Sequence, residues 1–395
     1  MANESVKTTI KKPRNVSLEL LRCIAMMMVV GLHYLGKGKL LPDMIKPEAW
    51  TAVGITAWGI EAICIVAVNV YMLISGYLLC CSHFKLSRLI SLYIQLWCYS
   101  VGVGAVAVLT GIMPREELDI YTLLRLGLPV SMEHYWFLTA YVYFYLLLPL
   151  LGLAVRKMTE KQHRVVVIIL LAVNCVLKSI LPFELSADKQ GYDFLWYSVM
   201  FLLASYIRLY SPKFMKKKWA AIMMVVGMVG SFAEIMAIGY VGMVTGKLEY
   251  IATVSMHYNH IFPVLGSIGL FGLVCNRDED NAVSAVKKVG PMGRLVLAVA
   301  PYTLGVYLLH ENLAVRFIWP KWLFSERIDS VPSLVGFVLL AMIVVFAAGI
   351  IVEFVRSKLF GLLHKGLKAI KPYRLLTEKI ESIDKVFAEK TAADK

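Results

Sequence analysis

The first long apolar stretch of the chain, from Leu18 to Tyr34, carries three ionisable side chains, Glu19, Arg22 and His33. Ionisable groups at membrane depth are costly, so they normally face a protein interior or a water-filled cavity, where they tend to be functional. Arg22 and His33 are close to three helical turns apart, so both would project from one face of a helix, about 16 Å from each other along its axis. Glu19, one turn before Arg22, is placed to orient the guanidinium.

The same spacing also has a purely structural interpretation, in which Arg22 reaches inner headgroups and His33 makes a polar contact at the outer interface. The distribution of the histidines argues for function, because imidazole serves as a general base or acid near neutral pH. Five of the eight map to the outer half of the membrane or to outer loops: His33, His134, His257, His260 and His310. We therefore expect an outward-facing polar cavity.

Two further groups of residues are weaker candidates for substrate contacts. Ser75, Gly76 and Tyr77 end the second apolar run, where small residues equally predict a close helix crossing. His310 and Glu311 fall in the outer half of a later apolar run, where they would orient His33, bind a sugar or form a structural contact between helices.

The chain offers little for metal or nucleotide chemistry. His257 and His260 lie three residues apart, but no matching carboxylate or third ligand accompanies them, so we predict no metal site. The sequence contains no Walker loop, no GxSxG elbow and no HExxH motif. ATP-driven and zinc-protease functions therefore lose support.

The elements that position these residues are membrane helices. The 395-residue chain is 59% apolar and only 17% charged, with a mean hydropathy of +0.68. Apolar runs of this length can cross a bilayer only as helices, because each helix satisfies its own backbone amides. We predict an all-α polytopic bundle of about ten spans, at residues 17–35, 55–79, 88–112, 135–155, 165–182, 194–210, 219–244, 252–275, 295–318 and 332–356.

The basic residues assign an orientation to this bundle. Of the 41 lysines and arginines, 11 fall on one side of the predicted membrane and the rest on the other. The positive-inside rule then places both termini in the cytoplasm. This distribution also accounts for the net charge of +14, so the bilayer is the expected partner and no nucleic acid is required.

The predicted organisation has three parts. Residues 1–16 form a cytoplasmic N-terminal tail, residues 17–356 the membrane domain, and residues 357–395 a cytoplasmic amphipathic and charged tail. In the last part, the stretch from Lys358 to Ile370 has the pattern of a basic amphipathic helix lying on the inner leaflet. Any chemistry is expected in the membrane domain.

Several motifs resemble one known family. The stretch from Arg22 to His33, R-C-I-A-M-M-M-V-V-G-L-H, resembles the arginine, ten residues, histidine signature of bacterial acyltransferase-3 membrane proteins. The resemblance continues in I-S-G-Y-L-L (Ile74 to Leu79), H-Y-W-F-L (His134 to Leu138) and Y-T-L-G-V-Y-L-L-H (Tyr302 to His310). It covers the chain from about Ser17 to Glu353.

This resemblance implies an enzyme of the bacterial cytoplasmic membrane that transfers acyl groups, commonly acetyl, onto cell-surface glycans. It implies that His33 is the catalytic histidine, that Arg22 supports it or the donor, and that Ser75 and Gly76 form a Ser-Gly-aromatic turn. Acetyl-CoA would be a co-substrate and no cofactor would be bound. Many members carry an additional extracytoplasmic esterase-like domain. We expect no such domain here, so a handover to a second active site would involve separate glycan-biosynthesis proteins.

Together these observations give a working hypothesis for the reaction. Arg22, with Arg88 or Arg208 near the same face, would hold the donor's phosphates, and the acyl arm would reach towards His33. His33 would act as a general base or carry the acyl group itself, with Tyr77, Asn69 or a backbone amide as oxyanion donor. The alternatives are a transporter or flippase for a lipid-linked sugar, and a sensor or scaffold with structural buried charges.

Overall fold

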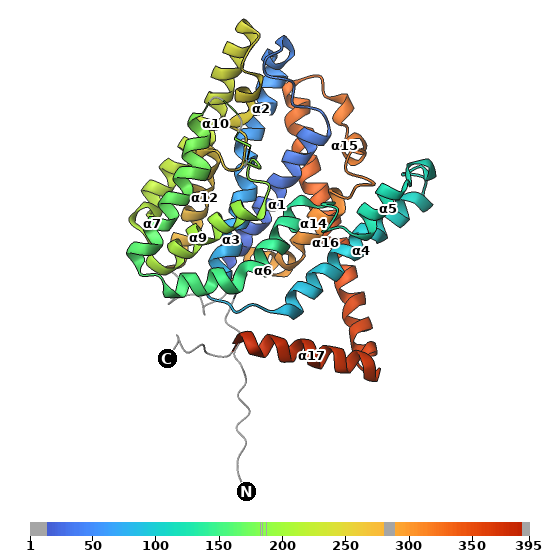
Figure 1. Cartoon of the computed structure of the whole chain (residues 1–395). Helices are drawn as coiled ribbons and strands as arrows, with labels where there is room; N and C mark the ends of the chain where they lie inside the picture. The colour runs from blue at the N-terminus through green and yellow to red at the C-terminus, as the bar shows by residue number, and fades with distance from the viewer. Residues whose placement is uncertain (1–13, 182, 184, 187, 280–288, 389–395) are drawn as a thin grey trace.

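The protein is an all-helical bundle in the part of the chain that the structure describes (Figure 1). The structure, a computed structural model, describes residues 14–181, 183, 185, 186, 188–279 and 289–388. Most of the predicted N-terminal tail, the last residues of the C-terminal tail and the basic residues Lys287 and Lys288 lie outside these ranges.

Eight helical segments within the described residues are long and apolar enough to cross a membrane. They are Val16–Lys37, Ala52–Leu79, Leu86–Leu109, Trp136–Lys157, Glu160–Ile180, Lys217–Thr245, Pro291–His310 and Val331–Leu367. Two shorter apolar helices, Phe194–Tyr210 and Ile261–Cys275, occupy the positions of the remaining predicted spans. The prediction of an all-α polytopic membrane bundle is confirmed.

The elements that build the centre of the bundle are these: α1 (Val16–Lys37), α2 (Ala52–Cys64), α3 (Val66–Leu79), α4 (Leu86–Leu109), α6 (Trp136–Lys157), α9 (Phe194–Tyr210), α12 (Ile261–Glu279), α13 (Pro291–Val299), α14 (Thr303–His310) and α16 (Val331–Leu367). The others are α5 (Ile120–Gly127), α7 (Glu160–Leu171), α8 (Lys178–Ile180), α10 (Lys217–Thr245), α11 (Glu249–Val254), α15 (Trp319–Trp322) and α17 (Lys371–Ala388), with a π-helical turn, Ala172–Leu177, between α7 and α8.

The helix α1 lies at the centre and contacts α2, α3, α12, α13, α14 and α16 (Figure 1). It begins at the N-cap Asn15, whose side chain accepts a hydrogen bond from the Leu18 amide at 3.0 Å. Most of its apolar side chains are buried, and Arg22 and His33 remain partly accessible. A central helix with a polar stripe must direct that stripe into the bundle.

Two predicted spans are interrupted, and the interruptions matter for the site. The span expected at 295–318 leaves the helix at His310, because Glu311 adopts a non-helical turn conformation with φ −91° and ψ 5°. The span expected at 252–275 divides into α11 and α12, with His257 and His260 in the turn between them. Both breaks place histidines at helix ends rather than inside apolar helices.

The C-terminal region differs in detail from the sequence-based expectation. Residues 358–367 continue α16 without a break, and α17 begins only at Lys371, running across below the bundle (Figure 1). The start of α4 and the C-terminal part of α17 are joined, because the Asp384 carboxylate accepts hydrogen bonds from the Ser87 amide and hydroxyl. Asp384 thereby caps α4, whose own N-cap residue makes no side-chain hydrogen bond.

Candidate functional site

A cavity of about 290 Å³ lies between α1, α3, α4, α6, α9 and the segment of residues 300–307 that leads into α14. The cavity is lined by Arg22, Arg88 and His33. Arg22 and His33, which are three turns apart on α1, therefore face one shared space. Between them the wall is largely aromatic: Tyr71, Trp136, Phe137, Tyr141, Tyr197 and Tyr307. A cavity that carries cations near one end and an imidazole near the other fits a charged ligand with an apolar extension.

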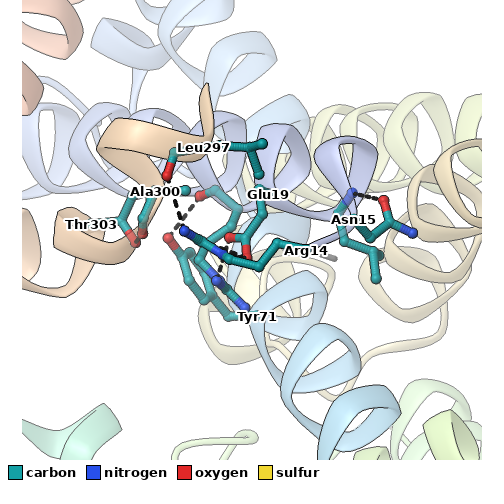
Figure 2. Close-up of polar contacts among 9 residues, drawn as sticks. Arg14, Asn15, Glu19, Tyr71, Leu297, Ala300 and Thr303 are labelled. Carbon is teal, nitrogen blue, oxygen red and sulfur yellow. Dashed lines mark hydrogen bonds and ion pairs between the residues drawn. The ribbon is translucent and has the colours of Figure 1, made fainter. Parts of the chain in front are cut away.

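The Arg22 end of the cavity is organised by an ion-pair network at the start of α1. The Arg22 guanidinium donates to Glu19 at 2.5 Å, and Arg14 donates to the other oxygen of Glu19 at 2.9 Å. Figure 2 shows Arg14 bridging from Glu19 to the carbonyl of Leu297 on α13, at 2.9 Å. The Tyr71 hydroxyl donates to the Arg22 carbonyl at 2.7 Å. Glu19 therefore orients Arg22, as the spacing predicted, and is itself held by Arg14.

Arg88 and Ser75 supply the other polar lining near this end. Arg88, in the first turn of α4, is exposed as well as lining the cavity, so the cavity reaches the surface of the described bundle at this end. Ser75 lines the cavity from α3. Both predicted candidates thus share the space with Arg22.

His33 meets His310 and Glu311 at the outer end. Its Nδ1 lies 2.8 Å from His310 Nε2 and 3.2 Å from Glu311 Oε2. The Nδ1 of His310 lies 2.6 Å from the Val306 carbonyl, four residues earlier on α14. Sequence reasoning linked His310 and Glu311 to His33 only as one of several roles; the structure brings all three together.

These contacts assign the protons of the two histidines. A carbonyl only accepts, so His310 Nδ1 carries the hydrogen that it donates to Val306. Neutral His310 then has a lone pair on Nε2, which accepts from His33 Nδ1–H. Neutral His33 therefore keeps its own lone pair on Nε2, while Glu311 stands beside the protonated nitrogen. In histidine general bases, one ring nitrogen takes the proton and the other faces a carboxylate, and His33 has this arrangement.

Glu311 is embedded among cations that the sequence analysis did not single out. Lys37 Nζ lies 3.3 Å from Glu311 Oε1, and Arg316 Nη1 lies 3.7 Å from the same oxygen. The Glu311 side chain is only 5% exposed, so these two cations are its partners inside the protein. The signal was present in the sequence, since Lys37 follows His33 by one helical turn.

The His134 and Tyr135 pair fixes the loop that carries Glu311. The Leu313 amide donates to His134 Nε2 at 2.8 Å, and His134 Nδ1 lies 2.8 Å from Ser100 Oγ. The Tyr135 hydroxyl donates to the Leu308 carbonyl at 3.0 Å and accepts from Asn312 Nδ2 at 2.9 Å. The two residues thus hold the chain on both sides of Glu311, which gives this motif a positioning role.

Burial, followed by the nearby Arg125 and Arg316 cations, lowers the pKa of His134 to about 3. The side chain is therefore neutral at physiological pH. A neutral imidazole is required here, because its Nε2 accepts a hydrogen bond from the Leu313 amide.

Other predicted residues lie outside the lining of the cavity. A Cβ atom on Gly76 would lie 2.8 Å from the Ala204 Cβ, so this glycine serves a close crossing of α3 and α9. Tyr77 packs on Phe271 and accepts a hydrogen bond from Arg208 at 2.6 Å. Gly76, Tyr77 and Arg208 are thus placed for helix packing rather than for contact with a ligand in this cavity.

Asn69, an oxyanion candidate from sequence, is fully buried and engaged. It donates to the Tyr258 carbonyl at 2.6 Å and accepts from Trp196 Nε1 at 3.0 Å. Both the nitrogen and the oxygen of its side-chain amide are therefore used, and they join α3 to α9 and to the turn before α12.

His257 and His260 belong to a different part of the bundle. His260 Nε2 lies 3.4 Å from Glu234 on α10, and the turn that carries both histidines contacts α8 through the Ile261 amide. No group of three or more metal-ligating side chains occurs in the described ranges. Glu61 and Glu234 are intramembrane carboxylates that sequence reasoning passed over, although a charge inside an apolar run marks such positions.

The sequence of the chain was compared with protein families, curated proteins and solved structures. A sequence model of the acyltransferase-3 family, described as an acyltransferase domain, matches residues 15–353. No curated protein and no solved structure shows a significant match to the chain. The match includes α1 with Arg22 and His33, the His134 motif and α14, and each of these three segments contributes side chains to the lining of the cavity. The chain therefore belongs to the acyltransferase-3 family and is a multi-pass membrane acyltransferase.

Proposed function

We propose that this protein transfers an acetyl group from cytoplasmic acetyl-CoA to a hydroxyl of a cell-surface glycan or its lipid-linked precursor, in the bacterial cytoplasmic membrane. The observation that carries the proposal is the contact of His33 Nδ1 with His310 and Glu311, 2.8 Å and 3.2 Å away. This contact leaves the Nε2 lone pair of His33, a side chain of the cavity wall, available to a substrate.

The donor enters, on this proposal, from the inner end. Arg22 and the exposed Arg88 would bind the phosphates of acetyl-CoA through charge-assisted hydrogen bonds, which guanidinium groups form well. Glu19 and Arg14 hold Arg22 in place, so its guanidinium is preorganised. The acyl arm then extends along the aromatic wall towards His33, a distance of about 16 Å along α1.

In the chemical step, His33 Nε2 takes the proton of the acceptor hydroxyl as the oxygen attacks the thioester carbonyl. The tetrahedral intermediate collapses, the carbon–sulfur bond breaks, and the imidazolium returns the proton to the departing CoA thiolate. Glu311 stabilises the imidazolium in between.

The proposal is tested by acetyl transfer from radiolabelled acetyl-CoA to cell-envelope glycan in membranes containing the protein. We expect His33→Ala to abolish incorporation and Arg22→Ala to raise the KM for acetyl-CoA. The matched controls are His364→Ala and Arg156→Ala, since both residues are exposed and lie away from the cavity. Both controls should retain activity.

Label incorporation that is independent of His33, at equal protein levels, would refute the assigned role. An absence of label in every fraction would exclude acetyl-CoA as donor and lead first to longer acyl-CoA donors. If these also fail, transport of a lipid-linked sugar becomes the better explanation, and vesicle uptake would measure it.

A further inference from the structure

Three cations lie on the Glu311 side of the site: Lys37 and Arg316 contact the Glu311 carboxylate, and Arg125 lies near Arg316 and His134. We call them the outer cationic cluster. Lys37 is the last residue of α1, Arg125 lies in the last turn of α5, and Arg316 lies in the turn after α14. Lys37 and Arg316 lie 3.3 Å and 3.7 Å from one Glu311 oxygen, whose partner oxygen contacts His33.

The fold gathers Arg125 into this cluster through a chain of hydrogen bonds. Ser100 Oγ donates to the carbonyl of Leu126, the residue after Arg125, at 2.7 Å. The same hydroxyl lies 2.8 Å from His134, whose Nε2 accepts from the Leu313 amide. Arg125 and Arg316 are close enough that each contributes to lowering the pKa of His134. Segments that are far apart in the sequence are thus held with their cations converging.

The charges of this cluster do not balance. Lys37 and Arg316 share the single carboxylate of Glu311, Arg125 makes no ion pair with a described residue, and no other described carboxylate lies within ion-pair distance of any of the three cations. By contrast, Arg356 has a carboxylate of its own, because it makes two hydrogen bonds to Glu353. A partly buried charge without a compensating partner is strongly unfavourable, so this surplus needs an explanation.

The arginines of the cluster also have unused donors. The Nε atoms of Arg125 and Arg316 are buried and make no hydrogen bond to any residue that the structure describes. The Arg316 side chain is 16% exposed and that of Lys37 26%, so the cluster remains accessible. Guanidinium donors match phosphate and carboxylate groups, which accept two parallel hydrogen bonds.

We propose that the outer cationic cluster binds a phosphate or carboxylate group of the acceptor, so that the acceptor is an anionic glycan or glycolipid. The inference rests on the proposed function and defines its acceptor class. The anionic group would bind beside Glu311, next to His33, and would position a nearby hydroxyl for attack. Such a contact selects acceptors by charge, because a neutral sugar leaves the cations uncompensated.

The test uses the full-length protein in nanodiscs of neutral phosphatidylcholine, with glucose 6-phosphate, glucuronate and glucose as probes. Binding is measured directly, and both wild type and His33→Ala are used, so that the result does not depend on catalysis. The variants are Arg125→Gln/Arg316→Gln and the charge-conserving Arg125→Lys/Arg316→Lys. The matched control is Arg115→Gln, an exposed arginine on the same predicted side.

We expect both anionic probes to bind wild type, His33→Ala and Arg115→Gln more tightly than glucose. The glutamine double variant should bind them about 10- to 100-fold more weakly, and the lysine double variant should retain most of the affinity. If the glutamine double variant does not fold, the single substitution Arg316→Gln is compared with Arg316→Lys. Equal binding of charged and neutral probes, or binding that ignores the arginines, would overturn the inference.

Two further binding measurements test whether a lipid headgroup or acetyl-CoA, rather than the acceptor, occupies the cluster. If phosphatidylglycerol in the nanodiscs displaces the sugar probes in an arginine-dependent way, a lipid headgroup occupies the cluster and the acceptor assignment fails. If the glutamine double variant loses affinity for acetyl-CoA, the cluster holds the donor and the assignment fails as well. Arginine-dependent sugar binding without any acetyl transfer would count against the proposed function alone.

Discussion

Replacement of Glu311 by glutamine tests the central interaction of the proposed mechanism. Glutamine has nearly the size and shape of glutamate, so the change removes the charge next to His33 while the loop geometry is kept by Asn312 and Leu313. In the reaction, His33 becomes an imidazolium 3.2 Å from Glu311 Oε2. The substitution therefore removes the electrostatic attraction between the His33 imidazolium and the Glu311 carboxylate at that distance.

Its magnitude follows from Coulomb's law. At 3.2 Å and an effective dielectric constant of about 20, the attraction is about 5 kcal/mol; at about 40, closer to the value beside an open cavity, it is about 2.6 kcal/mol. Each 1.36 kcal/mol changes the rate about tenfold, so kcat should fall by about 10²- to 10⁴-fold. The KM for acetyl-CoA should stay nearly constant, because the phosphates bind at the other end of the cavity.

The assay is steady-state acetyl transfer with purified protein in nanodiscs, with acetyl-CoA varied at a saturating acceptor concentration. Glu326→Gln is the matched control, since Glu326 is 67% exposed and pairs only with Lys321 among the described residues. A Glu311→Gln enzyme with a kcat within about threefold of wild type would refute the general-base mechanism. A large rise in the KM for acetyl-CoA with unchanged kcat would relocate Glu311 to donor binding.

Two stability predictions test the packing around the site. Gly76→Ala should lower the free energy of unfolding by about 1–3 kcal/mol, because the new methyl group would meet the Ala204 Cβ at 2.8 Å. The control is Gly102→Ala, because Gly102 has open space around it. Equal Tm values for the two variants would contradict the close crossing of α3 and α9. The lowered pKa of His134 makes the native state bind fewer protons than the unfolded state, so stability falls as the pH drops from about 6.5 towards 3. At about pH 5.5 this group should cost about 1.4 kcal/mol. The drop in Tm between about pH 7.5 and 5.5 should therefore be smaller in His134→Gln than in wild type, and an identical drop would show that His134 does not titrate in this way.

The sequence by itself determined the class of the protein and the principal axis of its site. Apolar runs long enough to cross a bilayer can only be helices, so the all-α polytopic bundle followed from composition and periodicity. The spacing of Arg22 and His33 placed them on one face, and the cavity that both line follows from the cost of exposing such groups to lipid. The family resemblance, carried by four motifs in order, agreed with the match over residues 15–353.

Tertiary structure alone decided which polar residues meet. His33 and His310 are separated by 277 positions, and their contact depends on where α14 stops, which is set by backbone conformation at Glu311 and by the hydrogen bonds of Tyr135. Gly76 matched a family motif yet serves a helix crossing, since a pattern cannot show which face of a helix meets another. Local sequence encodes periodicity and turn chemistry. Contacts between distant helices depend on the packing of the entire bundle, which is why the cations around Glu311 became visible only in three dimensions.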